Sequence, residues 1–303
     1  MEFEGRGYMQ HMTQGTAFYK LTGSGNDFVF FDARTGNGSA ALESADRIRE
    51  VCARGTGVGA DGAVFLVPSK IGDVGIRYYN SDGSHASLCG NATLCTVRLA
   101  QELGIEPRVS RRRDDKRELK IETDSGVVAA RMLPDGEPEF DLGVVDIVNP
   151  DVPIGHIAGE RTIGFALAGI PHLVVHVEDL EAVNVGGHGK TLRSDPSLGP
   201  DGANVNFVGV MPTRGGETGI RTYERGVEGE TLACGTGAVA TAAMLASWGL
   251  ADPEEPVRLW TRSGHPVRVR LRSSRPAGGL AGRWLASLAG EGRLVFRGEL
   301  AGV

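Results

Sequence analysis

Two cysteines in the sequence, Cys89 and Cys234, stand in the same local setting. Each is followed directly by glycine, and each run closes on a second glycine 15 residues after the cysteine, at Gly104 or Gly249. Apolar residues recur at helical spacing inside both runs, and the second run has no charged residue over 235–250. The pattern predicts two helices of equal length, each with a cysteine at its N-terminus and a glycine at its C-terminus.

Thiols at helix N-termini are suited to acid–base chemistry. Unpaired backbone amides and the positive end of the helix dipole both stabilise a thiolate, and the same amides bind carboxylates. If two such helices face each other, a substrate carboxylate lies between their ends and a thiol approaches its α-carbon from each side. One thiolate then removes the α-proton and the other thiol returns a proton to the opposite face. We therefore predict that Cys89 and Cys234 form a pair that inverts one carbon.

The segments that flank the two helices repeat as well. Residues 123–126 follow the first helix as residues 261–264 follow the second, each between two strand-like segments. Upstream, residues 26–31 parallel residues 171–176, each a turn that leads into a β-rich run. The repeat predicts an α+β fold of two related halves that meet near residue 140, each made mostly of strands around one buried helix.

Composition excludes several classes of protein. The net charge of -6 and the pI of about 5.7 give no general electrostatic reason to bind nucleic acid or an acidic membrane. With 41% hydrophobic and 23% charged residues, the chain resembles a soluble globular protein. It has no run of about 18 apolar residues and no signal-peptide pattern, so we expect a cytoplasmic protein. Residues 1–15 are expected to form a loose leader.

The other chemistries open to cysteine are less well supported. Four widely spread cysteines do not match a disulfide-stapled secreted domain. Cys52 and Cys95 fall on predicted helices and are interpreted as small hydrophobic core residues. A metal site is disfavoured, because the sequence has no Cys-x-x-Cys pair and no nearby cluster of histidines. A disulfide between Cys89 and Cys234 stays open as an oxidised, inactive state.

Six motifs in order along nearly the whole chain carry a resemblance to a known family. They are GSGNDF at 23–28, GVGADG at 57–62, NSDGS at 80–84 running into CGN at 89–91, PH at 171–172, NVNF at 204–207, and ERG at 224–226 running into ACGTG at 233–237. With these motifs the chain resembles the diaminopimelate epimerase family. The resemblance implies two β-barrel-like halves, each wrapped around a central helix, with the active site in the cleft between them.

The resemblance also implies an activity and a domain division. The activity is conversion of LL- to meso-diaminopimelate, in lysine and peptidoglycan precursor synthesis, with no pyridoxal phosphate, metal or other cofactor. The implied protein is a homodimer with no nucleic-acid or membrane partner. Residues 1–140 would form the N-terminal half, joined by a last strand at 289–303, and residues 141–288 the C-terminal half.

Roles for individual residues follow from the same resemblance. Cys89 and Cys234 match the acid–base pair, and His172 and Glu224 match positions near the thiols that tune their pKa. Arg225 suits a distal carboxylate, because its planar fork matches that group. The positions that hold the substrate, including its reacting carboxylate, are matched by Asn26, Asn80, Gly90, Asn91, Asn204, Glu224, Arg225, Gly235 and Thr236.

Three departures from the family pattern leave the substrate open. Gly62 stands where the family commonly has glutamine, and Ile170 stands where many members have an asparagine that binds the distal end of the substrate. The segment 224–234 is one residue longer than usual. These departures motivate one alternative, a racemase of the same fold that acts on another amino acid. A non-catalytic protein that uses the thiols for redox or ligand binding is a further alternative, disfavoured because both carboxylate-holding motifs are kept.

Overall fold

The computed structural model describes residues 15–36, 39–108, 118–273 and 283–301. Residues 1–14 of the expected leader lie outside them. Within the described residues the chain forms a mixed α+β fold with four α-helices and one large mixed sheet. The helices are α1 (Ala45–Cys52), α2 (Gly90–Glu102), α3 (Val185–Arg193) and α4 (Gly235–Ser247), with short 3-10 turns at Ser39–Leu42, Pro196–Leu198 and Pro212–Arg214.

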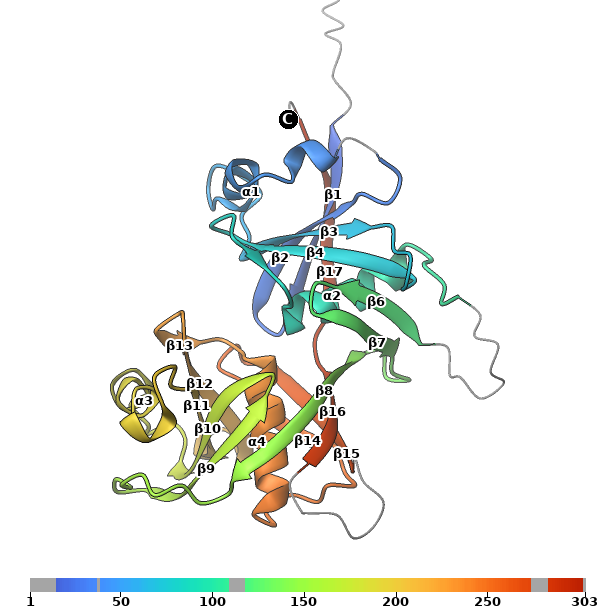
Figure 1. Cartoon of the computed structure of the whole chain (residues 1–303). Coiled ribbons are helices and arrows are strands. Elements are labelled where there is room, and N and C mark those ends of the chain that lie inside the picture. The colour runs from blue at the N-terminus through green and yellow to red at the C-terminus, as the bar shows by residue number, and fades with distance from the viewer. Residues whose placement is uncertain (1–14, 37–38, 109–117, 274–282, 302–303) are drawn as a thin grey trace, which may run out of the picture.

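One group of strands surrounds α2 in the upper part of Figure 1. Helix α2 packs against β1, β7, β8 and β17, and its buried residues belong to a large apolar cluster. The last strand, β17, pairs antiparallel with β1 and so returns the end of the chain to this group. The strands are β1 (Thr16–Gly23), β2 (Asn26–Asp32), β3 (Gly62–Val67), β4 (Val74–Asn80), β5 (His85–Ala86), β6 (Leu119–Thr123), β7 (Gly126–Met132) and β17 (Arg293–Leu300).

A second group of strands surrounds α4 in the lower part of Figure 1. Helix α4 contacts β8, β9, β10, β11, β15 and β16, and all of its residues from 237 to 245 are buried, as the lack of charge predicts. The strands are β8 (Pro138–Asn149), β9 (Glu160–Ala168), β10 (Ile170–Asp179), β11 (Asn204–Met211), β12 (Glu217–Glu224), β13 (Gly229–Thr231), β14 (Val257–Trp260), β15 (Pro266–Ser273) and β16 (Arg283–Ala289).

The two groups repeat the same local pairing. In the first, β2 runs parallel to β3, and β3 pairs antiparallel with β4, so that Gly62 lies opposite Asn80. In the second, β10 runs parallel to β11, and β11 pairs antiparallel with β12 from Val205 opposite Tyr223 onward. Each third strand then leads, through a short strand, into a helix that begins after a cysteine.

The chain passes between the groups in two places. Strand β8 pairs with β7, β9 and β16, and it continues through the boundary expected near residue 140. The return passage lies between β16 and β17, at 290–292. Arg98 on α2 forms hydrogen bonds at both crossings. Its Nε donates to the Gly292 carbonyl oxygen at 2.8 Å, and its Nη2 donates to the carbonyl oxygen of Gly136, just before β8, at 2.5 Å.

Candidate active site

Each of the paired cysteines is the N-cap residue of a core helix. Cys89 precedes α2 and Cys234 precedes α4, both with extended backbone, as the sequence predicts. The two helix starts adjoin, since a Cβ added to Gly90 would lie 4.0 Å from the Cα of Gly235. Two sets of free helix-terminal amides, each beside a thiol, therefore meet at one place in the molecule.

The crossing strands hold the helix starts together. A Cβ on Gly90 would lie 3.6 Å from Cζ of Phe140 on β8, and one on Gly235 would lie 3.0 Å from Cδ2 of Leu288 on β16. Phe140 and Leu288 are directly opposite each other in the β8–β16 pair, and both are fully buried. A side chain at residue 235 would push against Leu288, so glycine there allows the helices to approach closely.

Three donors lie around the Cys234 sulfur. The Gly237 amide donates to Sγ at 3.4 Å, the Thr236 hydroxyl lies 3.5 Å from it, and the Asn204 side-chain amide donates at 3.9 Å. Burial nevertheless raises the pKa of Cys234 to about 11, helped by the negative charge of Glu224. The free thiol is therefore protonated at neutral pH.

Cys89 has a comparable environment with different donors. Burial raises the pKa of its thiol above the usual value, and the charge of Glu224 acts in the same direction. Hydrogen bonds from the Ala92 and Asn91 amides and from the Tyr78 side chain lower the same pKa. The two thiols thus start out neutral, each beside donors that favour its ionised form.

Glu224 raises the pKa of both thiols. It ends β12, and its charge raises the pKa of Cys89 and of Cys234. Burial raises the pKa of Glu224 itself. The charge of Glu224 thus opposes ionisation of both thiols.

Two of the predicted asparagines meet at the start of α2. The Asn91 side chain donates to Oδ1 of Asn26 at 2.7 Å, and Asn26 donates in turn to Asp61 Oδ2 at 3.0 Å. Asn80 lies nearby on β4, where its Oδ1 accepts from the Tyr78 hydroxyl at 2.9 Å and its Nδ2 donates to Ser84 at 3.0 Å. These hydrogen bonds fix the side chains of the three asparagines.

His172 is fully buried and hydrogen-bonded to Asn206 rather than to a thiol. The Asn206 amide nitrogen lies 3.1 Å from His172 Nδ1 and 3.0 Å from the Leu173 carbonyl oxygen, and Thr222 donates to Asn206 Oδ1 at 3.0 Å. A carbonyl only accepts, so the amide nitrogen donates and Nδ1 is the acceptor.

The proton of His172 is therefore on Nε2, which is buried without a hydrogen-bond partner among the described residues. Burial and the charge of Arg225 lower the pKa of His172 to about 3, which keeps the ring neutral. The network reaches α4, because a Cβ on Gly237 would lie 2.2 Å from Asn206 Oδ1.

Arg225 is connected to Cys234 through Asn204. Its backbone amide donates to Asn204 Oδ1 at 2.9 Å, so Asn204 connects this arginine to the Cys234 sulfur. Its Nη1 makes one long contact, 3.4 Å to the Asp201 carbonyl oxygen, and the described residues offer the guanidinium no other partner.

Sheet register identifies equivalent residues near the cysteine of each half. In the first half Gly62 lies opposite Phe28 on one side and Asn80 on the other. In the second half Asn204 lies opposite His172 on one side, and the register of β11 and β12 places it opposite Glu224 on the other. Tyr78 and Thr222, two residues earlier on β4 and β12, correspond in the same way.

The sequence interpretation missed three residues with side chains at the site, Tyr78, Asn206 and Thr222. Each lies two residues from a predicted site residue on the same strand, and that alternation was the available signal.

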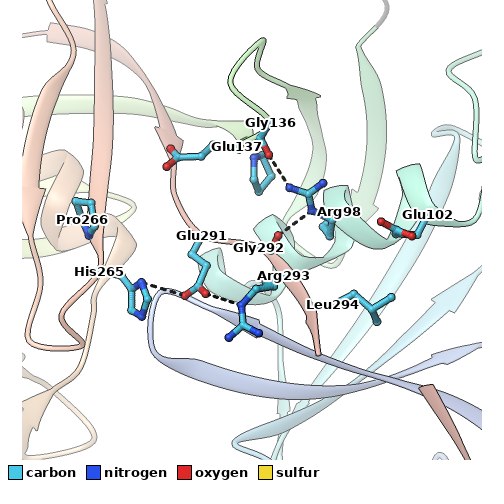
Figure 2. Close-up of a pocket in the computed structure, with 11 residues that line it drawn as sticks. Arg98, Glu102, Gly136, Glu137, His265, Pro266, Glu291, Gly292, Arg293 and Leu294 are labelled. Carbon is cyan, nitrogen blue, oxygen red and sulfur yellow. Dashed lines mark hydrogen bonds and ion pairs between the residues drawn. The ribbon is translucent and has the colours of Figure 1, made fainter. Parts of the chain in front are cut away.

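A separate pocket of about 470 Å³ lies where the chain crosses between the two groups of strands (Figure 2). Its lining includes Arg98, His265, Glu291 and Arg293 but neither Cys89 nor Cys234. The charges in it are paired, with Glu291 between His265 at 3.5 Å and Arg293 at 3.2 Å. It is therefore distinct from the thiol site.

The described part of the chain offers neither a metal site nor a membrane-spanning helix. No group of three or more His, Cys, Asp or Glu residues there is placed to hold a metal ion. None of the helices described is long and apolar enough to cross a membrane. Cys52 and Cys95 are buried free thiols, and burial raises the pKa of Cys95 far above its usual value, in agreement with their interpretation as core residues.

Known proteins match this chain over most of its length. The family model for diaminopimelate epimerase matches residues 18–148 and 165–272. A diaminopimelate epimerase from Gemmatimonas aurantiaca is 46% identical over 290 residues, which cover 95% of this chain and 100% of that protein. One from Aquifex aeolicus is 40% identical over 260 residues, or 83% of this chain and 88% of that protein. A solved phenazine biosynthesis protein of the PhzF family from Bacillus anthracis shares the fold, with a TM-score of 0.66 at 17% identity over 95% of this chain and 99% of that one. The chain therefore belongs to the diaminopimelate epimerase family.

Proposed function

We propose that the protein converts LL-diaminopimelate to meso-diaminopimelate, with Cys89 and Cys234 as the two acid–base groups. The observation that carries the proposal is the adjoining pair of helix starts, each capped by a cysteine. Family membership supports the substrate, since the relatives at 46% and 40% identity carry this name. The reaction would serve lysine and peptidoglycan precursor synthesis.

The helix ends supply the binding site for the reacting carboxylate. Backbone amides at Gly90 and Asn91 on one helix, and at Gly235 and Thr236 on the other, lie in the first turn, where they have no partner within the helix. Removing the α-proton turns the carboxylate into an enediolate with more negative charge on its oxygens. Amides that already point at those oxygens stabilise that state more than the ground state.

Proton transfer requires one of the two cysteines as a thiolate and the other as a neutral thiol. Because both thiols have raised pKa values, the reactive form carries one proton on the pair, and it is favoured as pH rises toward those values. The thiolate takes the α-proton and the opposite thiol delivers its own, so the pair ends with the proton moved from one sulfur to the other. The remaining family-matched residues, Asn26, Asn80, Asn204 and Arg225, would hold the rest of the substrate.

Incubation in D2O tests this function directly. With LL-diaminopimelate we expect meso product that carries solvent deuterium at the inverted carbon, because the incoming proton comes from a thiol that exchanges with water. Nuclear magnetic resonance of the α-position, with a panel of L-amino acids run in parallel, provides the measurement. Exchange with a monocarboxylic amino acid alone would contradict the diaminopimelate assignment, and exchange with none would favour a non-catalytic thiol protein.

A racemase of the same fold acting on another amino acid is the second candidate. Ile170, which replaces a family asparagine, begins β10 with 36% of its surface exposed, and it offers no hydrogen bond to the distal end of a substrate. Arg225 favours the dicarboxylic substrate, because its open guanidinium fork suits a second carboxylate.

We also propose that the two groups of strands are pseudo-symmetric barrel-like halves, each around its helix, with the site in the cleft between them. The support is the matched strand pairing and the placement of α2 and α4. The division proposed is 1–140 with 289–303 against 141–288. Equal hydrogen-exchange protection throughout both halves, with no step at these limits, would contradict it.

A homodimer in the cytoplasm is the proposed assembly and location. Phe296 and Val295 on β17 are 47% and 46% exposed, and in the described part of the chain this strand pairs with β1 alone, so an apolar edge is open to a second copy. All four cysteines are free, which suits a reducing compartment. Sedimentation velocity tests the dimer, and cell fractionation tests the cytoplasmic location.

A further inference from the structure

A polar network is buried on β10, β11 and β12 of the second half. The Asn206 amide nitrogen donates to His172 Nδ1 at 3.1 Å and to the Leu173 carbonyl oxygen at 3.0 Å. Its Oδ1 accepts from the Thr222 hydroxyl at 3.0 Å. His172 and Asn206 are fully buried, and Thr222 is 3% exposed. Both hydrogens of this amide and its oxygen therefore have partners inside the protein.

The first half has apolar side chains at the equivalent positions. Register makes Phe28 the equivalent of His172 and Val64 the equivalent of Asn206. Phe28 and Val64 are both fully buried, so strands packed around a helix can form this part of the core without polar groups. Burying an amide costs desolvation that burying a valine does not. The amide in the second half therefore needs a reason beyond the fold.

The two helices match these two arrangements. The residue three after the cysteine is Ala92 in α2 and Gly237 in α4. A Cβ added to Gly237 would lie 2.2 Å from Asn206 Oδ1, so a side chain there is excluded by that oxygen. Glycine is less favourable than alanine in a helix. The second half thus gives up stability twice, once for the amide and once for the glycine that accommodates it.

The amide controls the ring of His172. Because a carbonyl oxygen only accepts, the Leu173 contact fixes the amide nitrogen toward β10, and His172 Nδ1 must accept from it. A neutral imidazole that accepts at Nδ1 has its proton on Nε2, which has no hydrogen-bond partner among the described residues. His172 lies beside Asn204 in register, and Asn204 donates to the Cys234 sulfur. The ring is therefore on the face of the sheet that meets the thiol.

We propose that Asn206 is a positioning residue, which holds His172 with its proton on Nε2 so that the ring offers the site a donor, and that residue 237 is glycine to make room for this amide. The proposal rests on the proposed function, in which negative charge develops on the thiol and on the reacting carboxylate. A donor stabilises such charge, whereas the other tautomer would present a lone pair and oppose it. Asn206 acts through His172 and needs no contact with the substrate.

The tautomer can be measured without substrate. Heteronuclear NMR of isotope-labelled histidine rings distinguishes a protonated from an unprotonated ring nitrogen, and a His172→Gln spectrum assigns the signals. In the unchanged protein we expect the proton on Nε2 and none on Nδ1. Asn206→Asp places a carboxylate beside Nδ1, so Nδ1 should acquire a proton. A proton already on Nδ1 in the unchanged protein, or no change in Asn206→Asp, would overturn the proposal.

Two controls separate the tautomer from a general loss of packing. Thr222→Val removes the hydrogen bond to Asn206 Oδ1 and leaves the backbone carbonyl that orients the amide, so it should lower Tm without moving the proton of His172. His188 is the internal reference, since its Nε2 lies 2.6 Å from Glu160 Oε1, and its signals should stay in place. A change in Thr222→Val as large as that in Asn206→Asp would assign the effect to packing and contradict the proposal.

The repeat supplies a rescue experiment. Asn206→Val combined with Gly237→Ala reproduces the pair that the first half has at Val64 and Ala92. We expect Gly237→Ala alone to lower Tm, because its Cβ meets Asn206 Oδ1, and the double variant to recover Tm, because that oxygen is gone. If the double variant melts no higher than Gly237→Ala, the amide is not the reason for the glycine, and that part of the proposal is wrong.

Kinetics with diaminopimelate give the functional readout. We expect the folded double variant and Asn206→Asp to lower kcat about tenfold or more with little change in KM, because the developing charge exists only in the transition state. An unchanged kcat in both would overturn the positioning role. If the unchanged enzyme shows the expected tautomer but does not turn over diaminopimelate, the proposed function fails while the control of His172 by Asn206 stands.

Discussion

Cys89→Ser and Cys234→Ser each lose epimerisation by about 10²- to 10⁴-fold or more, the range that a positioned proton-transfer group supplies. A serine hydroxyl is a far weaker acid than a thiol, so it neither forms the anion at neutral pH nor delivers a proton as readily. Conversion of LL-diaminopimelate in D2O, followed by the appearance of the meso isomer, is the measurement. Full activity in either variant would remove the two-thiol mechanism.

The same substitutions should leave the fold intact. Both cysteines are helix N-caps, and Cys234 already accepts a hydrogen bond from the Gly237 amide. Serine is among the best N-cap residues, so the melting temperature should stay level or rise while activity disappears. Cys95→Ala serves as the control, because Cys95 is fully buried on α2 and takes no part in the proposed reaction. It should lose stability and keep its activity.

The sequence was sufficient to predict the elements that carry the thiols. Helix α2 ends at Glu102 and α4 at Ser247, and each is followed within two residues by a glycine with positive φ, 64° at Gly104 and 69° at Gly249. Cap residues and apolar spacing are local signals, so a repeat of both within one chain specifies both helices. The flanking strands β6, β7, β14 and β15 were predicted for the same reason.

The parts of the site that depend on strand register were not predictable in this way. At Gly62 a Cβ would lie 2.6 Å from the Tyr79 carbonyl oxygen on the neighbouring strand, a contact that no local signal in the sequence announces. The hydrogen bond of His172 to Asn206 follows from the parallel pairing of β10 with β11, and the sequence alone did not predict it. Such contacts join residues far apart in the chain, and register fixes which side chains meet.

Arg225→Met should selectively weaken the binding of diaminopimelate. Hydrogen bonds to a charged group contribute about 1.5–3 kcal/mol, so losing the proposed contact between the guanidinium fork and the distal carboxylate should lower kcat/KM roughly 10- to 150-fold. We expect the loss to appear mainly in KM, because the distal carboxylate is bound equally in the ground state and the transition state. Arg225→Lys keeps the charge but not the fork, so its kcat/KM should fall between that of the unchanged enzyme and that of Arg225→Met.

Arg193→Met is the matched control for this prediction. Arg193 donates to the same Asp201 carbonyl oxygen at 3.4 Å as Arg225 does, but it is paired with Glu228 at 2.8 Å. Its loss should change local stability and leave KM for diaminopimelate unchanged. A monocarboxylic amino acid, if it is turned over at all, should be insensitive to both arginines. If Arg225→Met weakens monocarboxylic and dicarboxylic substrates equally, the arginine acts at the reacting carboxylate, and the distal-end assignment is wrong.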